Sequence, residues 1–237
     1  MRRALPLLAV LVVIAGALGF FAWQSAREEE ALAAARFARE QRAERAEEDR
    51  NRRWEELGRA SAEYVPGMLG EVRLGLTRNA LLQARPGATP PMRTGSGEPR
   101  LEEALPNGAQ VVYVLDRAGE RVARVQVLSQ IPAEGVPPHL QAMRDQYGDP
   151  QVVLRCSEQS AAGVPTLRFV WGDERVAMQD IFLIHPRGVS VTLYVAGADA
   201  LADSLRAGGC APVRSREELD QLGVATPEML APRVIDP

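Results

Sequence analysis

The segment from Ala4 to Trp23 constrains this chain most, because its 20 residues, ALPLLAVLVVIAGALGFFAW, carry no charge. A helix of that length spans about 30 Å, which matches the hydrocarbon core of a bilayer. Eleven of the residues are Leu, Ile, Val or Phe, and together they favour insertion by about 3 to 7 kcal/mol. We therefore expect a transmembrane helix over residues 4–23 with Trp23 at one membrane interface.

A cleaved signal peptide is the alternative for this segment. Arg2 and Arg3 are typical of a signal-peptide n-region, and Ala15-Gly16-Ala17 forms an A-x-A cleavage site. Cleavage after Ala17 would leave the apolar sequence LGFFAW exposed at the new N-terminus. The permanent anchor is the preferred interpretation.

The arginines on the two sides of this segment are nearly equal in number, so they orient the helix only weakly. Arg2 and Arg3, directly before the helix, favour residues 1–3 as a short cytoplasmic tail. Cys156 and Cys210, the two cysteines of the chain, support this orientation if they form a disulfide, since disulfides persist outside the cytoplasm. Two unrelated buried thiols are the alternative. The expected location is the inner (cytoplasmic) membrane, single-pass, with the C-terminal domain periplasmic or otherwise extracytoplasmic.

Residues 24–63 predict a charged helical stalk. Ala, Glu, Arg and Gln dominate this segment, which contains no Pro and no Gly before Gly58. A coiled coil that forms a homo-oligomer is one interpretation. Its few large apolar residues, Leu32, Phe37, Trp54 and Leu57, fit no sustained heptad, so a single solvated helix is at least as good a description.

Composition excludes several functional classes. The net charge of −3 gives no electrostatic basis for binding nucleic acid. All 28 basic residues are Arg, which excludes lysine Schiff-base chemistry and a P-loop lysine. His139 and His185 are the two histidines, and no HExxH or CxxC motif is present. We assign no cofactor, no metal site and no catalytic residue.

Residues 64–212 predict an α+β domain: an antiparallel sheet of two meanders, with helices packed on one face. We expect a short strand at 72–74, a helix over 78–85 capped by Thr77, a loop over 87–99 and a hairpin of 110–116 with 121–129. A helix over 136–147, four strands between 151 and 196 and a helix over 199–206 complete the domain. The tail, 213–237, includes a short helix over 216–222.

The sequence VRLGLTRNALL resembles the helix opening of small envelope α+β modules. These include the small lipoprotein of the outer-membrane β-barrel assembly machinery (the BamE/SmpA type) and β-lactamase-inhibitor-like modules. Gly75 and Thr77 carry the resemblance, and Tyr147-Gly148-Asp149-Pro150 is similar to the helix ending found there. The chain differs in having no lipid-attachment cysteine. The resemblance implies a protein-binding module of the cell envelope.

We therefore expect an anchored interaction or scaffold protein that binds a protein partner in the envelope. Trp171 and the 87–99 loop, with Thr94 and Ser96, are the candidate contacts. One alternative is a membrane-tethered hydrolase, for which the polar candidates are Asp173, Glu174 and Asp180; a pocket that contained Asp180 or His185 would favour it. A second alternative is a division- or secretion-type subunit that associates through its transmembrane and stalk helices.

Overall fold

A computed structural model describes residues 5–90, 97–156, 166–185, 188–207 and 209–213 of the chain. Between residues 5 and 34 the side chains are described at Gln24 and Arg27 alone, and those of 184–185 and 203–207 also lie outside the description. The chain divides into two units, Met1–Arg53 and Trp54–Pro237. The helix expected over 216–222 lies outside the described residues.

The first unit is formed by helix α1, which runs from Leu5 to Ser61 and ends in the second unit. The helix expected over the charged segment is therefore present. Its side chains are largely exposed from Ala35 to Arg53, including an Asp49–Arg52 ion pair one turn apart and the ring of Phe37, which is 62% exposed. Within the described part of the chain, no helix is both long enough and apolar enough to cross a membrane. The side chains of the expected anchor, residues 4–23, fall outside that part.

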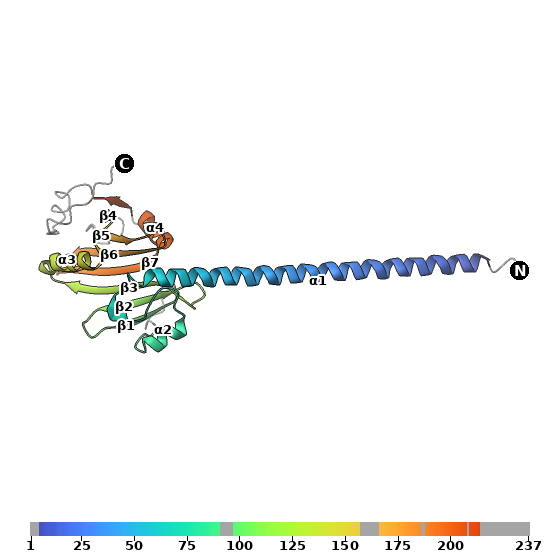
Figure 1. Ribbon diagram of the computed structural model, residues 1–237, viewed down its shortest axis with the longest axis horizontal. Coiled ribbons are helices and arrows are strands. Elements are labelled where there is room, and N and C mark those ends of the chain that lie inside the picture. The colour runs from blue at the N-terminus through green and yellow to red at the C-terminus, as the bar shows by residue number, and fades with distance from the viewer. Residues whose placement is uncertain (1–4, 91–96, 157–165, 186–187, 208, 214–237) are drawn as a thin grey trace. The chain divides into compact units, whose positions relative to one another are not determined.

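The second unit contains an eight-stranded antiparallel sheet in the order β1-β2-β3-β7-β6-β5-β4-β8 (Figure 1). Its strands are β1 Arg100–Ala104, β2 Gln110–Leu115, β3 Val122–Ile131, β4 Val152–Cys156, β5 Thr166–Gly172, β6 Val176–His185, β7 Gly188–Gly197 and β8 Cys210–Pro212. The hairpin and the four-strand meander expected from the sequence are both present, and the α+β class with an antiparallel sheet is confirmed.

The sheet consists of two meanders that join through their last strands. Strands β1 to β3 follow helix α2 (Arg78–Ala84), and strands β4 to β7 follow helix α3 (Val136–Tyr147). The final strands, β3 and β7, pair antiparallel, with Val127 opposite Leu193. The sheet is thus two helix-then-meander units that meet at the β3–β7 boundary.

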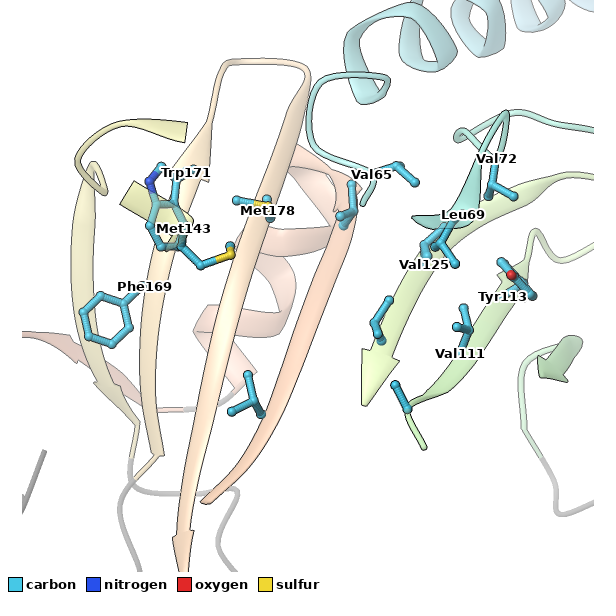
Figure 2. Close-up of a cluster of buried hydrophobic side chains, with 14 of the residues drawn as sticks. Val65, Leu69, Val72, Val111, Tyr113, Val125, Met143, Phe169, Trp171 and Met178 are labelled. Carbon is cyan, nitrogen blue, oxygen red and sulfur yellow. The ribbon is translucent and has the colours of Figure 1, made fainter. Parts of the chain in front are cut away.

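The main core lies on the face of the sheet covered by α2 and α3. Leu81 of α2, Leu140 and Met143 of α3, and Leu69 of the short helix η1 (Gly67–Leu69) pack against alternating residues of the strands. Figure 2 shows part of this core, with Val111, Tyr113 and Val125 from the first meander and Phe169, Trp171 and Met178 from the second. The two-residue alternation of the strands places these side chains on one face.

Helix α4 (Ala198–Ala207) packs on the opposite face, so the expectation that the helices share one face was wrong. Its Leu201 contacts a second apolar cluster made of Leu154, Cys156, Val170 and Ala177. These residues alternate with core residues such as Phe169 and Met178, so strands β4 to β6 bury apolar side chains on both faces. Helix α4 therefore buries the apolar surface on this second face of the sheet.

Cys156 and Cys210 form a disulfide, as the sequence led us to expect. The two residues lie directly opposite each other in the pairing of β4 with β8. Strand β8 has three residues and ends in a proline, so its own ladder hydrogen bonds are few. The disulfide therefore fastens the end of α4 and the edge strand to β4.

Three local predictions were wrong in detail. Residues 72–74 form no strand; Thr77 instead makes an isolated bridge to Arg121. Strands β1 and β8 were not expected, because RLEEA and CAP carry no period-2 apolar pattern. Both strands exist because an adjacent strand, β2 or β4, offers unpaired backbone groups. The expected Thr77 cap is confirmed, with its Oγ1 accepting a hydrogen bond from Ala80 N at 3.3 Å.

Candidate functional site

A histidine–aspartate pair joins α3 to the centre of the sheet. His139 lies in the first turns of α3, and its Nε2 is 2.7 Å from Oδ2 of Asp180 on β6. The side chain of Asp180 is fully buried, whereas that of His139 is 29% exposed. In the sheet, Asp180 lies opposite Leu193 of β7 and Phe169 of β5. The carboxylate is therefore held in apolar surroundings, where a charge requires a partner.

The electrostatics of the pair favour a charged histidine. Burial of the ring lowers the pKa of His139, but the hydrogen bond and the charge of Asp180 outweigh that effect and raise the pKa above its ordinary value. Burial and the same carboxylate also raise the pKa of Tyr147. The second oxygen of Asp180, Oδ1, is buried without a hydrogen-bond partner in the described part of the chain. This oxygen is the one unsatisfied acceptor of the pair.

A His–Asp pair can act as a general base when a nucleophile or a bound water reaches the free ring nitrogen. Here the ring packs edge-on against Phe182, with centroids 5.7 Å apart. Within the described residues, no hydroxyl or thiol hydrogen-bonds to His139, and no group of three or more His, Cys, Asp or Glu side chains is arranged to hold a metal ion. What the contacts show is a polar clamp between α3 and the sheet.

Asp173 and Glu174 lie in the turn between β5 and β6, apart from this pair in the described part of the chain. The carboxylate of Asp173 accepts hydrogen bonds from Arg175 N and Val176 N in the turn between β5 and β6, and these lower its pKa. Glu174 is exposed in the same turn. Of His185 only the backbone is described, at the end of β6. Asp173 thus has a turn-stabilising role.

Trp171 lies in the core. It is 3% exposed, and its indole N–H donates to the carbonyl oxygen of Gly148 at 2.9 Å. Its ring neighbours are Tyr147 and Phe169, each with a centroid 6.4 Å away. We therefore do not retain Trp171 as a contact residue. Thr94 and Ser96, the other two candidate contacts, lie outside the described residues.

An open groove lies at the β1 edge of the sheet, where the β1–β2 turn faces the end of α2. We call it the edge groove; its volume is about 520 Å³. Its apolar lining residues are Met68, Ala84, Pro86, Leu105 and Pro106, and its polar ones are Arg85, Glu103 and Asn107. Met68 is 56% exposed, one of two exposed large apolar side chains, with Phe37, among the residues whose side chains are described. A groove of this size can hold one or two side chains of a partner.

The two charges in the edge groove neutralise each other. Arg85 donates to Glu103 in a bidentate arrangement, Nε to Oε2 at 2.9 Å and Nη2 to Oε1 at 2.8 Å. The hydroxyl of Tyr113 on β2 donates to the same Oε2 at 2.8 Å. Burial and this bond to Glu103 raise the pKa of Tyr113 well above its usual range. The polar part of the groove is thus a fixed, internally satisfied network.

Sequence reasoning missed the edge groove because its residues come from three separated segments. Met68 follows the stalk helix, Arg85 and Pro86 end α2, and Leu105 to Asn107 form the β1–β2 turn. The one available signal was the charged pair of Arg85 and Glu103, and nothing in their spacing indicates that they meet.

No protein-family model, curated protein or solved structure matches the chain. The function proposed below therefore rests on the residues and contacts of this chain.

Proposed function

We propose that this protein is a membrane-anchored interaction protein whose extracytoplasmic α+β domain binds a protein partner through the edge groove. The observation that carries the proposal is the groove itself, an open hollow with apolar walls and neutralised charges. Exposed apolar surface of this kind is retained where it contacts a partner. A hydrolase that used His139 as its base would need a nucleophile or a bound water at the ring, and the described contacts of that ring are the hydrogen bond to Asp180 and the packing against Phe182.

The tether is the second part of the proposal. Residues 4–23 are long and apolar enough to anchor the chain, and the helical, charged segment that follows them suits a spacer. The disulfide between Cys156 and Cys210 supports a location outside the cytoplasm, in an oxidising compartment. The proposed arrangement is a single-pass inner-membrane protein, N-terminus in, with the partner in the envelope.

Site-specific photo-crosslinking in intact cells tests the proposal. A photoreactive residue at Asn107 or Met68 places the probe in the edge groove. A matched control at Arg117 places it on the exposed β2–β3 turn, at the other end of β2. We expect a discrete protein adduct from positions 107 and 68 that is missing from position 117. Equal labelling at all three positions, or none at the groove, would show that the groove binds no protein.

A further inference from the structure

Strand β1 forms one edge of the sheet, and its outer side is only partly paired. In an antiparallel ladder, alternate residues direct their N–H and C=O to the neighbouring strand or away from it. Leu105 N–H donates to Ala109 O on the β2 side, so Ala104 and Glu102 direct their backbone groups outward. On that outer side Thr89 exchanges both hydrogen bonds with Glu102, at 2.9 and 2.7 Å.

The chain's own covering segment stops before it reaches Ala104. The residue that would pair with Ala104 is Gly87, two positions before Thr89, but the backbone turns there, with Ala88 N–H donating to Arg85 O at 3.0 Å. No backbone hydrogen bond joins Gly87 to Ala104 in the described part of the chain. Ala104 is exposed. Its N–H and C=O therefore form an open pairing site.

This open pairing site adjoins the edge groove. Ala104 directly precedes Leu105 and Pro106 in the groove wall, and Arg85 and Pro86 form the facing wall. An extended segment that enters beside Thr89, which already occupies Glu102, would pair with Ala104 through its backbone and direct a neighbouring side chain to the face of the groove. Because Arg85 and Glu103 already neutralise each other, a charged side chain would gain no partner there. Apolar walls favour an apolar side chain.

We propose that the partner is an extended polypeptide segment of another protein. It adds to β1 at Ala104 and inserts an uncharged apolar side chain, such as Leu or Met, into the edge groove. The inference rests on the proposed function, that the groove binds a protein, and specifies how it does so. Main-chain pairing supplies affinity in this mode, and the groove selects the side chain.

Two substitutions at Ala104 test the pairing by the same in-cell crosslink from position 107. Ala104→Pro removes the outward N–H without removing a bond to β2, because proline is tolerated where an edge N–H faces solvent. Ala104→Val keeps the N–H. We expect the adduct to fall about tenfold in Ala104→Pro, the scale of one lost hydrogen bond plus steric obstruction, and to change less than about twofold in Ala104→Val.

Two substitutions at the exposed Met68 test the apolar side of the groove. Met68→Glu places a charge in it, and Met68→Leu keeps it apolar. We expect the adduct to fall about tenfold in Met68→Glu and to persist in Met68→Leu. An adduct that persists in both Ala104→Pro and Met68→Glu overturns this mode while leaving the proposed function intact. If the unsubstituted chain gives no adduct from the groove, the proposed function is overturned as well.

Because a folding defect in Ala104→Pro would also lower the adduct, a second test uses the unsubstituted full-length chain. Once the crosslinked partner is identified by mass, hydrogen exchange at the Ala104 amide is compared with and without it, in detergent. Slower exchange at Ala104, with no change at the exposed amide of Arg117, supports the pairing. Unchanged exchange at Ala104 overturns it. An adduct with the mass of two copies of this chain would assign the groove to self-association and also overturn the proposal.

Discussion

Nε2 of His139 on α3 lies 2.7 Å from Oδ2 of Asp180, a fully buried carboxylate at the centre of the sheet. The two residues are 41 positions apart in the sequence, so the contact ties the helix that opens the second meander to that meander's third strand. Because the carboxylate is buried, loss of its histidine partner would leave a charge uncompensated in the core.

Removing the histidine from this pair should be strongly destabilising. His139→Gln leaves Asp180 buried without a cationic partner, and breaking a buried pair in this way costs about 3 kcal/mol. Urea denaturation followed by circular dichroism measures the change. The exposed Ala142→Gln on the same helix is the control and should change the free energy of unfolding by less than about 0.5 kcal/mol. A loss as small as the control's would contradict the proposed clamp.

The same pair should make stability depend on pH. Because the folded-state pKa of His139 is raised, its contribution is fully present below the ordinary histidine value of about 6.5 and is lost as pH rises through the folded-state value. The difference in unfolding free energy between the natural chain and His139→Gln should therefore shrink from pH 5.5 to pH 9. A difference that is constant over this range would mean that His139 is neutral when folded.

Reducing the disulfide should loosen one edge of the sheet. Loss of the Cys156–Cys210 bond, by reductant or in the double variant Cys156→Ala, Cys210→Ala, should cost about 2 to 4 kcal/mol. Hydrogen exchange should accelerate at Ala211 and in α4, which β8 holds to the sheet, and change little in β2. If exchange accelerated equally in β2, the disulfide would be stabilising the whole domain rather than the β8 edge.

Gly75 should tolerate substitution less well than a glycine with the same backbone angle in open space. Gly75 has φ +77°, and an added Cβ would lie 2.7 Å from the backbone oxygen of Trp54. Gly108 has φ +83° with nothing within 4 Å. Both changes to Ala carry the cost of a left-handed residue, about 1 to 2 kcal/mol. Gly75→Ala should cost about 1 to 3 kcal/mol more, because backbone must move. If Gly75→Ala and Gly108→Ala lost equal thermal stability, the backbone at Trp54 would move aside at little energetic cost.

A charge placed in the expected anchor should release the protein from membranes. Val12→Arg introduces a penalty of about 2.5 to 3.5 kcal/mol at the centre of residues 4–23, comparable to the total drive for insertion. Alkaline carbonate extraction followed by blotting should find the natural chain in the pellet and much of the variant in the supernatant. A natural chain already in the supernatant, with its N-terminus near Leu18, would identify the segment as a cleaved signal peptide.

The sequence alone determined the features that depend on nearby residues. The helix over 25–61 follows from a run of strong helix formers, and α3 follows from Pro137 and Pro138 at its start and Gly148 at its end. The strands β4 to β7 follow from β-branched and aromatic runs separated by turn residues. In each case the propensity, the cap or the turn is local.

Only the tertiary structure decided the features that depend on distant pairing. RLEEA has no strand pattern and becomes β1 because β2 offers a free edge, and α4 covers the second face because Leu154, Val170 and Ala177 are apolar there. The edge groove and the His139–Asp180 contact likewise join segments far apart in the chain. The period-2 pattern determines on which face of the sheet a side chain lies. It does not determine which strand or helix packs against that side chain. That choice is made by long-range burial and by the requirement that backbone groups find partners.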